Sequence, residues 1–333
     1  MKDSDGFQES IAEHVILYAP DAEHGEGIGI ARRYGVNAYP SFVLVSADGE
    51  VMDRWLGYGD TAPFLATLEE ATTAPLTLSE RKKRFRGEPN AADAVKIGDL
   101  QRDAGLSGEA LAWYHRAESL DATRFLGADM LEAYARGARD GLYSREQVRD
   151  QAMAVLKDER ASARQVAETV ALIDRGTQDG DRQPYLTALE LGVQRLSMPA
   201  TDEDRRLEAG LRANYAVLVD KDSKAAYGWK VKSLEPGWQE DANALNGLAW
   251  WCFENGVALD KAEEHARKGV ALAEDPSARA NVMDTLAEIC NARGDCGEAL
   301  ELIQGALQLV PDNEYLQKQL ARFEKLVAEQ KQG

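Results

Sequence analysis

The sequence predicts a partial α/β fold at the N-terminus, residues 1–72, and an all-α helical solenoid over residues 91–329. Three observations lead to this division. Two short β-rich runs flank an Asp48-Gly49 turn, which is typical of a β-hairpin. Between residues 73 and 90 the composition shifts towards Pro, Gly and basic side chains, which indicates a linker. After residue 90 the strand signals vanish, and Ala, Leu, Glu and Arg recur with helical periodicity.

The composition excludes several classes of protein. The 333 residues include 39 Lys+Arg and 57 Asp+Glu, a net charge of −18, whereas binding to phosphate groups requires clustered cations. Three cysteines cannot form the framework of a disulfide-rich fold. No apolar run approaches the length of a transmembrane helix. We therefore expect no nucleic-acid partner and no membrane span.

Four elements are expected before residue 72. The hairpin has the clearest signal, because its β-rich runs are separated by a tight Asp-Gly turn. In the last helix Phe64, Leu65 and Leu68 fall on one face. The expected elements are a strand at His14–Tyr18, a helix at Gly27–Tyr34 ended by Gly35, the hairpin Ser41–Ser46 with Glu50–Trp55, and a helix capped by Asp60 that runs to about Ala71.

Helical periodicity continues from residue 90 to the C-terminus. Short turn signals such as Asp140-Gly141 and Pro199 divide it into segments. A polar terminal helix is expected at 314–329, where it would cover the end of the array. The middle helices are expected near 125–137, 144–157, 161–175, 183–196, 202–219 and 221–233.

Three segments of this region resemble the tetratricopeptide (TPR) repeat. The pattern places small residues where two helices cross and large residues in the groove between repeats. Residues 280–313 match it at every position considered, residues 91–124 lack the closing proline, and residues 242–276 require a short insertion near Val257-Ala258. The matching positions of the first segment are Met283, Leu286, Ala287, Cys290, Gly294, Ala299, Ile303, Ala306 and Pro311.

A second resemblance concerns the N-terminal block. The run Tyr34–Ser41, followed by Phe42–Val45, Asp48-Gly49 and Gly57-Tyr58, resembles the C-terminal half of a thioredoxin fold. The resemblance implies a cis peptide bond in the segment Tyr39, Pro40, Ser41. Because only about 5–6% of X-Pro bonds are cis in folded proteins, this expectation depends on the resemblance and not on the dipeptide.

The dithiol of the thioredoxin family is missing. Its chemistry needs two cysteines spaced C-x-x-C at a helix N-terminus, and no such pair occurs in this sequence. Two explanations of the missing cysteines stay open. We favour a gene start assigned too late, at an internal methionine; the alternative is a true loss of the redox half of the domain. The chain as written carries no signal peptide and is expected in the cytoplasm, whereas an upstream start would allow a periplasmic or exported protein.

TPR arrays bind extended peptides or other chains on a concave face built from the first helix of each repeat. This face carries acidic residues here, so the family's carboxylate-gripping mode is not expected, and a neutral or basic segment fits better. Of Trp250 and Trp251, at least one is expected to pack between repeats, because adjacent helical residues point about 100° apart. The expected peptide-binding residues are Asp99, Arg102, Asn243, Asn246, Trp250, Phe253, Asn281, Asp284, Glu288 and Asn291.

No other chemistry is indicated. Cys252 and Cys290 fall at the same buried repeat position and are expected to act as small apolar residues, whereas Cys296 lies in a turn. The four histidines are scattered, and none has partners at metal-ligand spacing. We expect no catalytic residue, no cofactor and no metal site.

Two functions remain open from the sequence. The favoured one is a protein-interaction protein of thioredoxin/TPR type, which serves thiol–disulfide exchange in its full-length form but lacks the dithiol as written. The other is a non-catalytic TPR scaffold or adaptor with a vestigial thioredoxin-like half-domain. Neither identifies the partner or the oligomeric state.

Overall fold

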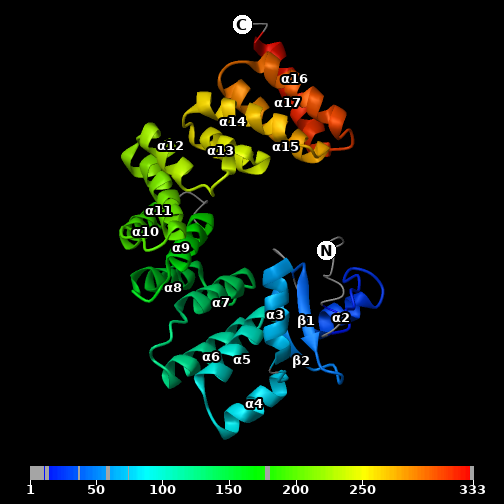
Figure 1. Cartoon of the computed structure of the whole chain (residues 1–333), viewed down its shortest axis with the longest axis vertical. Coiled ribbons are helices and arrows are strands. Elements are labelled where there is room, and N and C mark those ends of the chain that lie inside the picture. Colours follow the sequence, from blue (N-terminus) through cyan, green and yellow to red (C-terminus); the bar gives the residue numbers. More distant parts are fainter. Residues whose placement is uncertain are drawn as a thin grey trace. The chain divides into compact units, whose positions relative to one another are not determined.

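The computed structural model describes residues 11, 15–36, 38–57, 61–73, 75–176 and 181–330. A small two-stranded sheet near the N-terminus is followed by a long series of helices (Figure 1). The chain divides into two compact units, Met1–Ala161 and Ser162–Gly333. The coarse layout expected from the sequence, a short α/β segment and then a helical array, is confirmed.

The hairpin forms where the sequence predicts it. Strands β1 (Ser41–Val45) and β2 (Val51–Leu56) are antiparallel, and Phe42 is paired with Trp55. Gly49 closes the turn with a φ of 76°, a conformation that favours glycine because other residues meet a Cβ clash there. The Tyr39–Pro40 bond, which precedes β1, is cis, as the resemblance implies.

An aromatic cluster covers one face of the hairpin. The rings of Phe42 and Trp55 are stacked with centroids 5.7 Å apart. Phe64 of α3 (Thr61–Thr73) meets Phe42 edge-on at 4.8 Å, and Leu68 is buried beside it. The predicted apolar face of this helix is therefore confirmed, although Asp60, its predicted cap, lies outside the described residues. Helix α2 (Gly27–Arg33) also lies within its predicted range.

The predicted strand His14–Tyr18 is wrong over the residues that the structure describes. Val15–Tyr18 have no strand conformation, and His14 lies outside the described residues. The side chain of Ile16 is 97% exposed, and Tyr18 donates a hydrogen bond to Glu26. A strand requires a neighbour for its backbone hydrogen bonds. In the described part of the chain β1 pairs with β2 alone, so the β-rich composition of this run was not sufficient.

The segment predicted as a linker, 73–90, contains the helix α4 (Leu78–Gly87). Thr77 and Glu80 form a capping box at its N-terminus. Phe85 packs edge-on against Trp113 at 5.0 Å, which holds this helix against the array. The domain boundaries at residues 72 and 90 stay a prediction.

From residue 91 onward the described part of the chain is a succession of α-helices, with one short 3-10 helix at Trp238–Glu240. Their positions agree with the segments predicted from periodicity. They are α5 (Ala91–Asp103), α6 (Ser107–Leu120), α7 (Gly127–Arg139) and α8 (Arg145–Lys157) in the first unit, and α9 (Ala163–Gly176), α10 (Gln183–Arg195), α11 (Asp202–Tyr215), α12 (Ser223–Lys232), α13 (Ala242–Asn255), α14 (Leu259–Leu272), α15 (Pro276–Ala292), α16 (Cys296–Leu309) and α17 (Glu314–Gln330) in the second.

The end of one helix and the beginning of another differ from the prediction. The helix expected over 202–219 changes at Ala216 into a π-helical turn, Ala216–Asp220, which ends at Lys221 with a φ of 55°. Helix α15 begins at Pro276, before the predicted repeat start at residue 280, because Asp275 caps it and proline suits the first turn.

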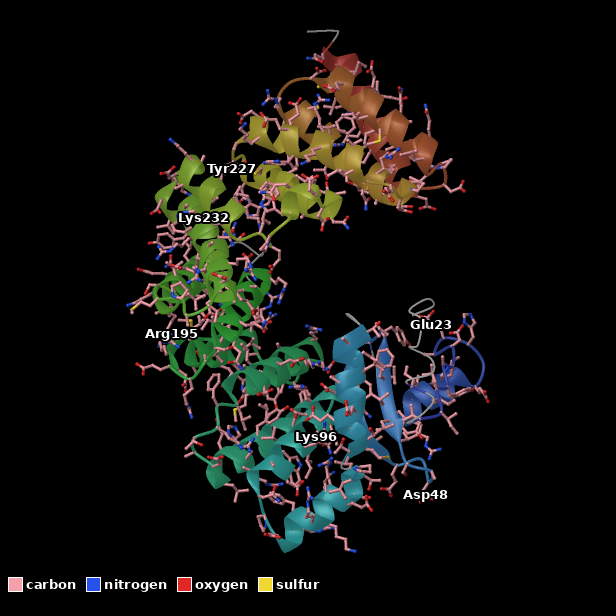
Figure 2. The ribbon with its side chains drawn as sticks, in the orientation of Figure 1. Glu23, Asp48, Lys96, Arg195, Tyr227 and Lys232 are labelled. Carbon is pink, nitrogen blue, oxygen red and sulfur yellow. The ribbon has the colours of Figure 1, made fainter. Side chains whose placement is uncertain are left out.

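Contacts with α5 attach the hairpin to the first helix pair. The Lys96 ammonium lies 2.6 Å from a carboxylate oxygen of Asp53, which is 5% exposed. Figure 2 labels Lys96 on α5. Arg54 donates hydrogen bonds to the backbone carbonyls of Tyr34 and Asp103, at 2.7 and 3.2 Å. An ion pair between the buried Asp53 and the partly exposed Lys96, together with the Arg54 guanidinium, thus joins the small sheet to the helical region within the first unit.

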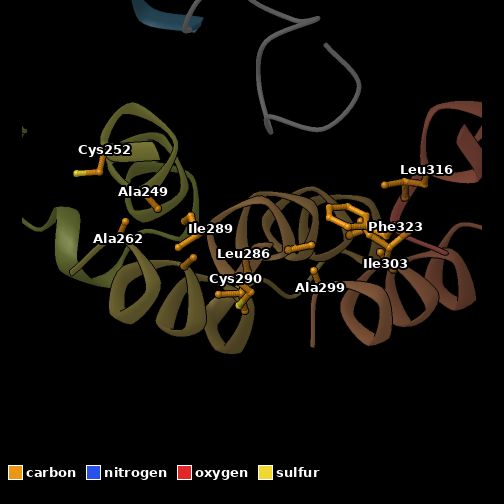
Figure 3. Close-up of a cluster of buried hydrophobic side chains, with 14 of the residues drawn as sticks. Ala249, Cys252, Ala262, Leu286, Ile289, Cys290, Ala299, Ile303, Leu316 and Phe323 are labelled. Carbon is orange, nitrogen blue, oxygen red and sulfur yellow. The ribbon is translucent and has the colours of Figure 1, made fainter. Parts of the chain in front are cut away.

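The helices of the second unit follow the arrangement of a repeat array. Each helix contacts the next in sequence, and the first helices of successive pairs, α13 and α15, also contact each other. Ala249, Ala262 and Ala299 have no exposed surface, which lets the helices approach closely (Figure 3). The terminal helix α17 adds Leu316 and Phe323 to this core.

Candidate functional site

The predicted binding residues of the second unit lie on α13 and α15. Asn243, Asn246, Trp250 and Phe253 occupy the same repeat positions on α13 as Asn281, Asp284, Glu288 and Asn291 occupy on α15. Because these first helices contact each other, the eight residues belong to one surface of the second unit. We call this surface, defined by these eight residues, the α13–α15 face.

Trp250 is the exposed aromatic residue of this face. Its side chain is 36% exposed, and its ring centroid lies 5.3 Å from that of the half-buried Phe253. Trp251 turns into the protein, where its indole N–H donates to Asn214 Oδ1 at 3.3 Å. The expectation that one of the two tryptophans packs inside is confirmed, and the other is available to a ligand.

The two acids of the face are covered by the terminal helix. Asp284 and Glu288 are 9% and 8% exposed. Tyr315 donates to Asp284 Oδ2 at 3.1 Å, and Gln319 donates to Glu288 Oε1 at 3.1 Å. Arg322 forms an ion pair with Glu288. The sequence did not indicate that α17 side chains meet these acids.

Burial makes the Asp284 carboxylate costly to ionise. Loss of solvent is the main reason that its pKa is raised, and the nearby Glu288 raises it further, against the hydrogen bond from Tyr315. Asp284 Oδ1 and Asn246 Oδ1 are buried and make no hydrogen bond within the described residues. Both oxygens are acceptors, and they lie at equivalent positions of α13 and α15.

Asn243 and Asn281, at the start of the two helices, are exposed. Their amides can donate and accept, which suits a peptide backbone. Asn291 is half-buried, and its Oδ1 accepts a hydrogen bond from the Cys296 thiol at 3.2 Å.

In the first unit Asp99 and Arg102 form part of an internal network instead of an open face. The Arg102 side chain is 14% exposed and lies 3.0, 3.2 and 3.3 Å from carboxylates of Asp103, Asp129 and Glu132. Tyr114 donates to Asp99 at 2.9 Å. These contacts link α5, α6 and α7, and they occupy the groups that were expected to face a ligand.

The three cysteines are free. Cys252 and Cys290 are 0% and 2% exposed, as expected for apolar packing positions. Burial raises the pKa of Cys252 to about 11. Burial, together with Glu298 and Glu263, raises the pKa of Cys290 to about 12. Both are therefore protonated thiols near neutral pH.

We expect a single thiol of the folded protein to react rapidly with Ellman's reagent. Cys296 is partly exposed, whereas the other two are buried and protonated, and only the thiolate attacks the reagent. All three should react in denaturant. Cys296→Ser should remove the rapid reaction and leave only the slow reaction of the two buried thiols. Rapid reaction of two or three thiols in the folded protein would show that Cys252 or Cys290 is not buried.

A group of Glu263, Cys290 and Glu298 brings three potential ligand atoms within 4.8 Å of one another. Arg267 lies 2.7 and 2.6 Å from the two glutamates, and Arg293 lies 2.9 Å from Glu263. These arginines neutralise both carboxylates, so ion pairs explain why the two glutamates lie close together beside Cys290. The described histidines contact separate residues: His24 contacts Asp21, His115 contacts Glu118 and His265 contacts Tyr227.

No protein-family model matches the sequence, and no match is found among curated proteins. Within the described ranges, none of the helices combines the length and apolar character that crossing a membrane requires.

Proposed function

We propose that this chain is a protein-interaction protein of thioredoxin/TPR type, whose α13–α15 face binds an extended segment of a partner protein. The observation that carries the proposal is the exposed Trp250, packed beside Phe253 on a face that also carries the exposed Asn243 and Asn281. Aromatic anchors supply most of the binding energy at such surfaces, and amides satisfy the backbone of the bound segment.

The order and packing of the helices support the TPR assignment. First helices of successive pairs contact each other, and small residues have no exposed surface at the predicted crossings. In the repeat of residues 91–124, a Cβ added to Gly98 would lie 2.6 Å from the Tyr114 ring, so a small residue is required there.

The cis Tyr39–Pro40 bond and the hairpin support the thioredoxin-like assignment of the N-terminal block. Under this proposal, the helical array would hold a partner protein for thiol–disulfide exchange. The 333-residue chain contains no C-x-x-C pair, so we expect it to show no catalysed insulin reduction above a free-thiol control.

A scaffold function is the second candidate, and one observation favours it. Asp53 and Arg54 of the hairpin bond to Lys96 and to the Asp103 carbonyl of α5. In that role the N-terminal block covers the first helix pair, as terminal caps do in repeat proteins. Insulin reduction by the 333-residue chain would exclude the purely structural role.

Trp250→Ala tests the proposed binding. Peptides selected from a random phage library on the folded chain should bind the variant roughly 10- to 30-fold more weakly in fluorescence anisotropy, because an aromatic anchor is lost. Met198→Ala is the control, because this side chain is 91% exposed and outside the face. Failure to select any peptide, or equal binding by both variants, would contradict the proposal.

A further inference from the structure

Three consecutive apolar side chains of the first unit are exposed. Ile16, Leu17 and Tyr18 are 97%, 51% and 60% exposed, and the run Val15–Tyr18 contains no charged residue. Within the described residues, the backbone N–H and C=O groups of residues 16–18 make no hydrogen bond to other backbone groups. A β-rich run in this state becomes a strand only by pairing with a neighbour, and the pairing would also bury its apolar side chains.

Strand β1 offers an edge of the same character. It carries no charged side chain, and β2 is its one neighbour in the described sheet, so its second edge has no strand beside it there. Contacts with α4 and α5 are made by β2. Natural proteins protect such edges with charged side chains, prolines or bulges. Here Pro40 precedes the strand and the register shifts between Leu44 and Val45, which leaves the edge of Ser41–Leu44 without these devices.

We propose that the run Val15–Tyr18 of one copy of this chain pairs as a strand with the second edge of β1 in another copy. The exchange is reciprocal, so a closed dimer covers both runs and both edges. Such a two-fold interface uses the same surface on each copy. Val15 and Phe42 of β1 pack against the same buried cluster beside α3, so the run and the edge belong to one region of the first unit.

A second copy is favoured as the occupant because each copy supplies both halves of the interface. The net charge of −18 makes two copies repel each other, so they associate best where no like charges meet. Residues 15–18 and 41–45 satisfy this condition, since neither segment carries a charged side chain. The association uses the first unit and is independent of partner binding at the α13–α15 face.

Sedimentation velocity of the 333-residue chain over a range of concentrations tests the proposal. The wild type should show an equilibrium between monomer and dimer. Ile16→Lys should raise the dissociation constant of the dimer by at least about tenfold, because it introduces a charge at both strand pairings. Ile16 is 97% exposed, so the circular dichroism of the variant should be unchanged. Met198→Lys, at an apolar side chain that is 91% exposed, is the matched control and should dimerise like the wild type.

Amide hydrogen exchange locates the pairing. The amides of residues 16–18 and of β1 should exchange more slowly at high than at low protein concentration. Leu17→Pro should remove this difference in both segments, because proline weakens a paired strand. A monomer at every concentration, a dimer that Ile16→Lys leaves unchanged, or protection confined to other segments would overturn the proposal. Assembly beyond the dimer would overturn the reciprocal exchange.

Discussion

Arg102→Met is expected to lower the free energy of unfolding by about 2–4 kcal/mol near neutral pH. The Arg102 guanidinium contacts carboxylates of Asp103, Asp129 and Glu132, and its side chain is 14% exposed. Methionine preserves the length and apolar packing of the arginine stem but leaves these acids facing one another. Partial solvent exposure of Asp129 and Glu132 reduces the loss below that of a fully buried pair.

The loss should depend on pH, with a defined sign. Burial raises the pKa of Asp99 and of Asp129 in the folded protein, and Arg102 opposes this rise. Without Arg102 both pKa values rise further. A carboxyl group whose pKa is higher in the folded than in the unfolded state destabilises the fold above the folded pKa, and this penalty disappears as the pH falls. The variant should therefore regain part of its deficit relative to wild type as the pH falls from neutral towards the ordinary titration range of a carboxyl group.

Urea unfolding at several pH values measures this effect. Arg139→Met provides the control, because Arg139 is an exposed arginine of α7, and a change of less than about 0.5 kcal/mol is expected. If the stability deficit of the Arg102 variant stays constant or grows on acidification, the carboxylates left unpaired by the substitution are not its cause.

The helices could be predicted from the sequence because local signals agree with one another. The segment expected at 144–157 forms α8, where Ser144 and Gln147 make a capping box before an apolar stripe that buries Val155. The hairpin was predictable for the same reason, since the Asp48-Gly49 turn and the flanking β-rich runs favour one structure. The run Val15–Tyr18 had strand composition alone, and composition does not supply a pairing partner.

The site was predictable only in part, because repeat position identifies which helix face a residue occupies but not what covers it. Trp250, Asn243 and Asn281 are exposed on α13 and α15, at positions that were expected to face a partner. Asp284 and Glu288 occupy the same face, yet α17 contributes Tyr315, Gln319 and Arg322 to them. These contacts join residues about thirty positions apart, on a helix that sequence periodicity indicates only as a polar terminal segment.

Helix α17 should prove essential to the stability of the second unit, although its exposed face is polar. Phe323→Ala is expected to lower the free energy of unfolding by about 3–5 kcal/mol, because it removes a fully buried aromatic ring and leaves a cavity. The ring packs in the same core as Ile303 of α16 and Leu286 of α15, so the cavity would open between the last helices of the array (Figure 3).

The position of the ring decides between two roles of this helix. If α17 only shields the array from solvent, any substitution on it should be tolerated to a similar degree. Lys325→Ala, an exposed change two residues away, is expected to alter the stability by less than about 0.5 kcal/mol. A large difference between the two variants in thermal or urea unfolding would show that α17 completes the core of the array. A loss of less than about 1 kcal/mol in Phe323→Ala would show instead that the core closes without this helix.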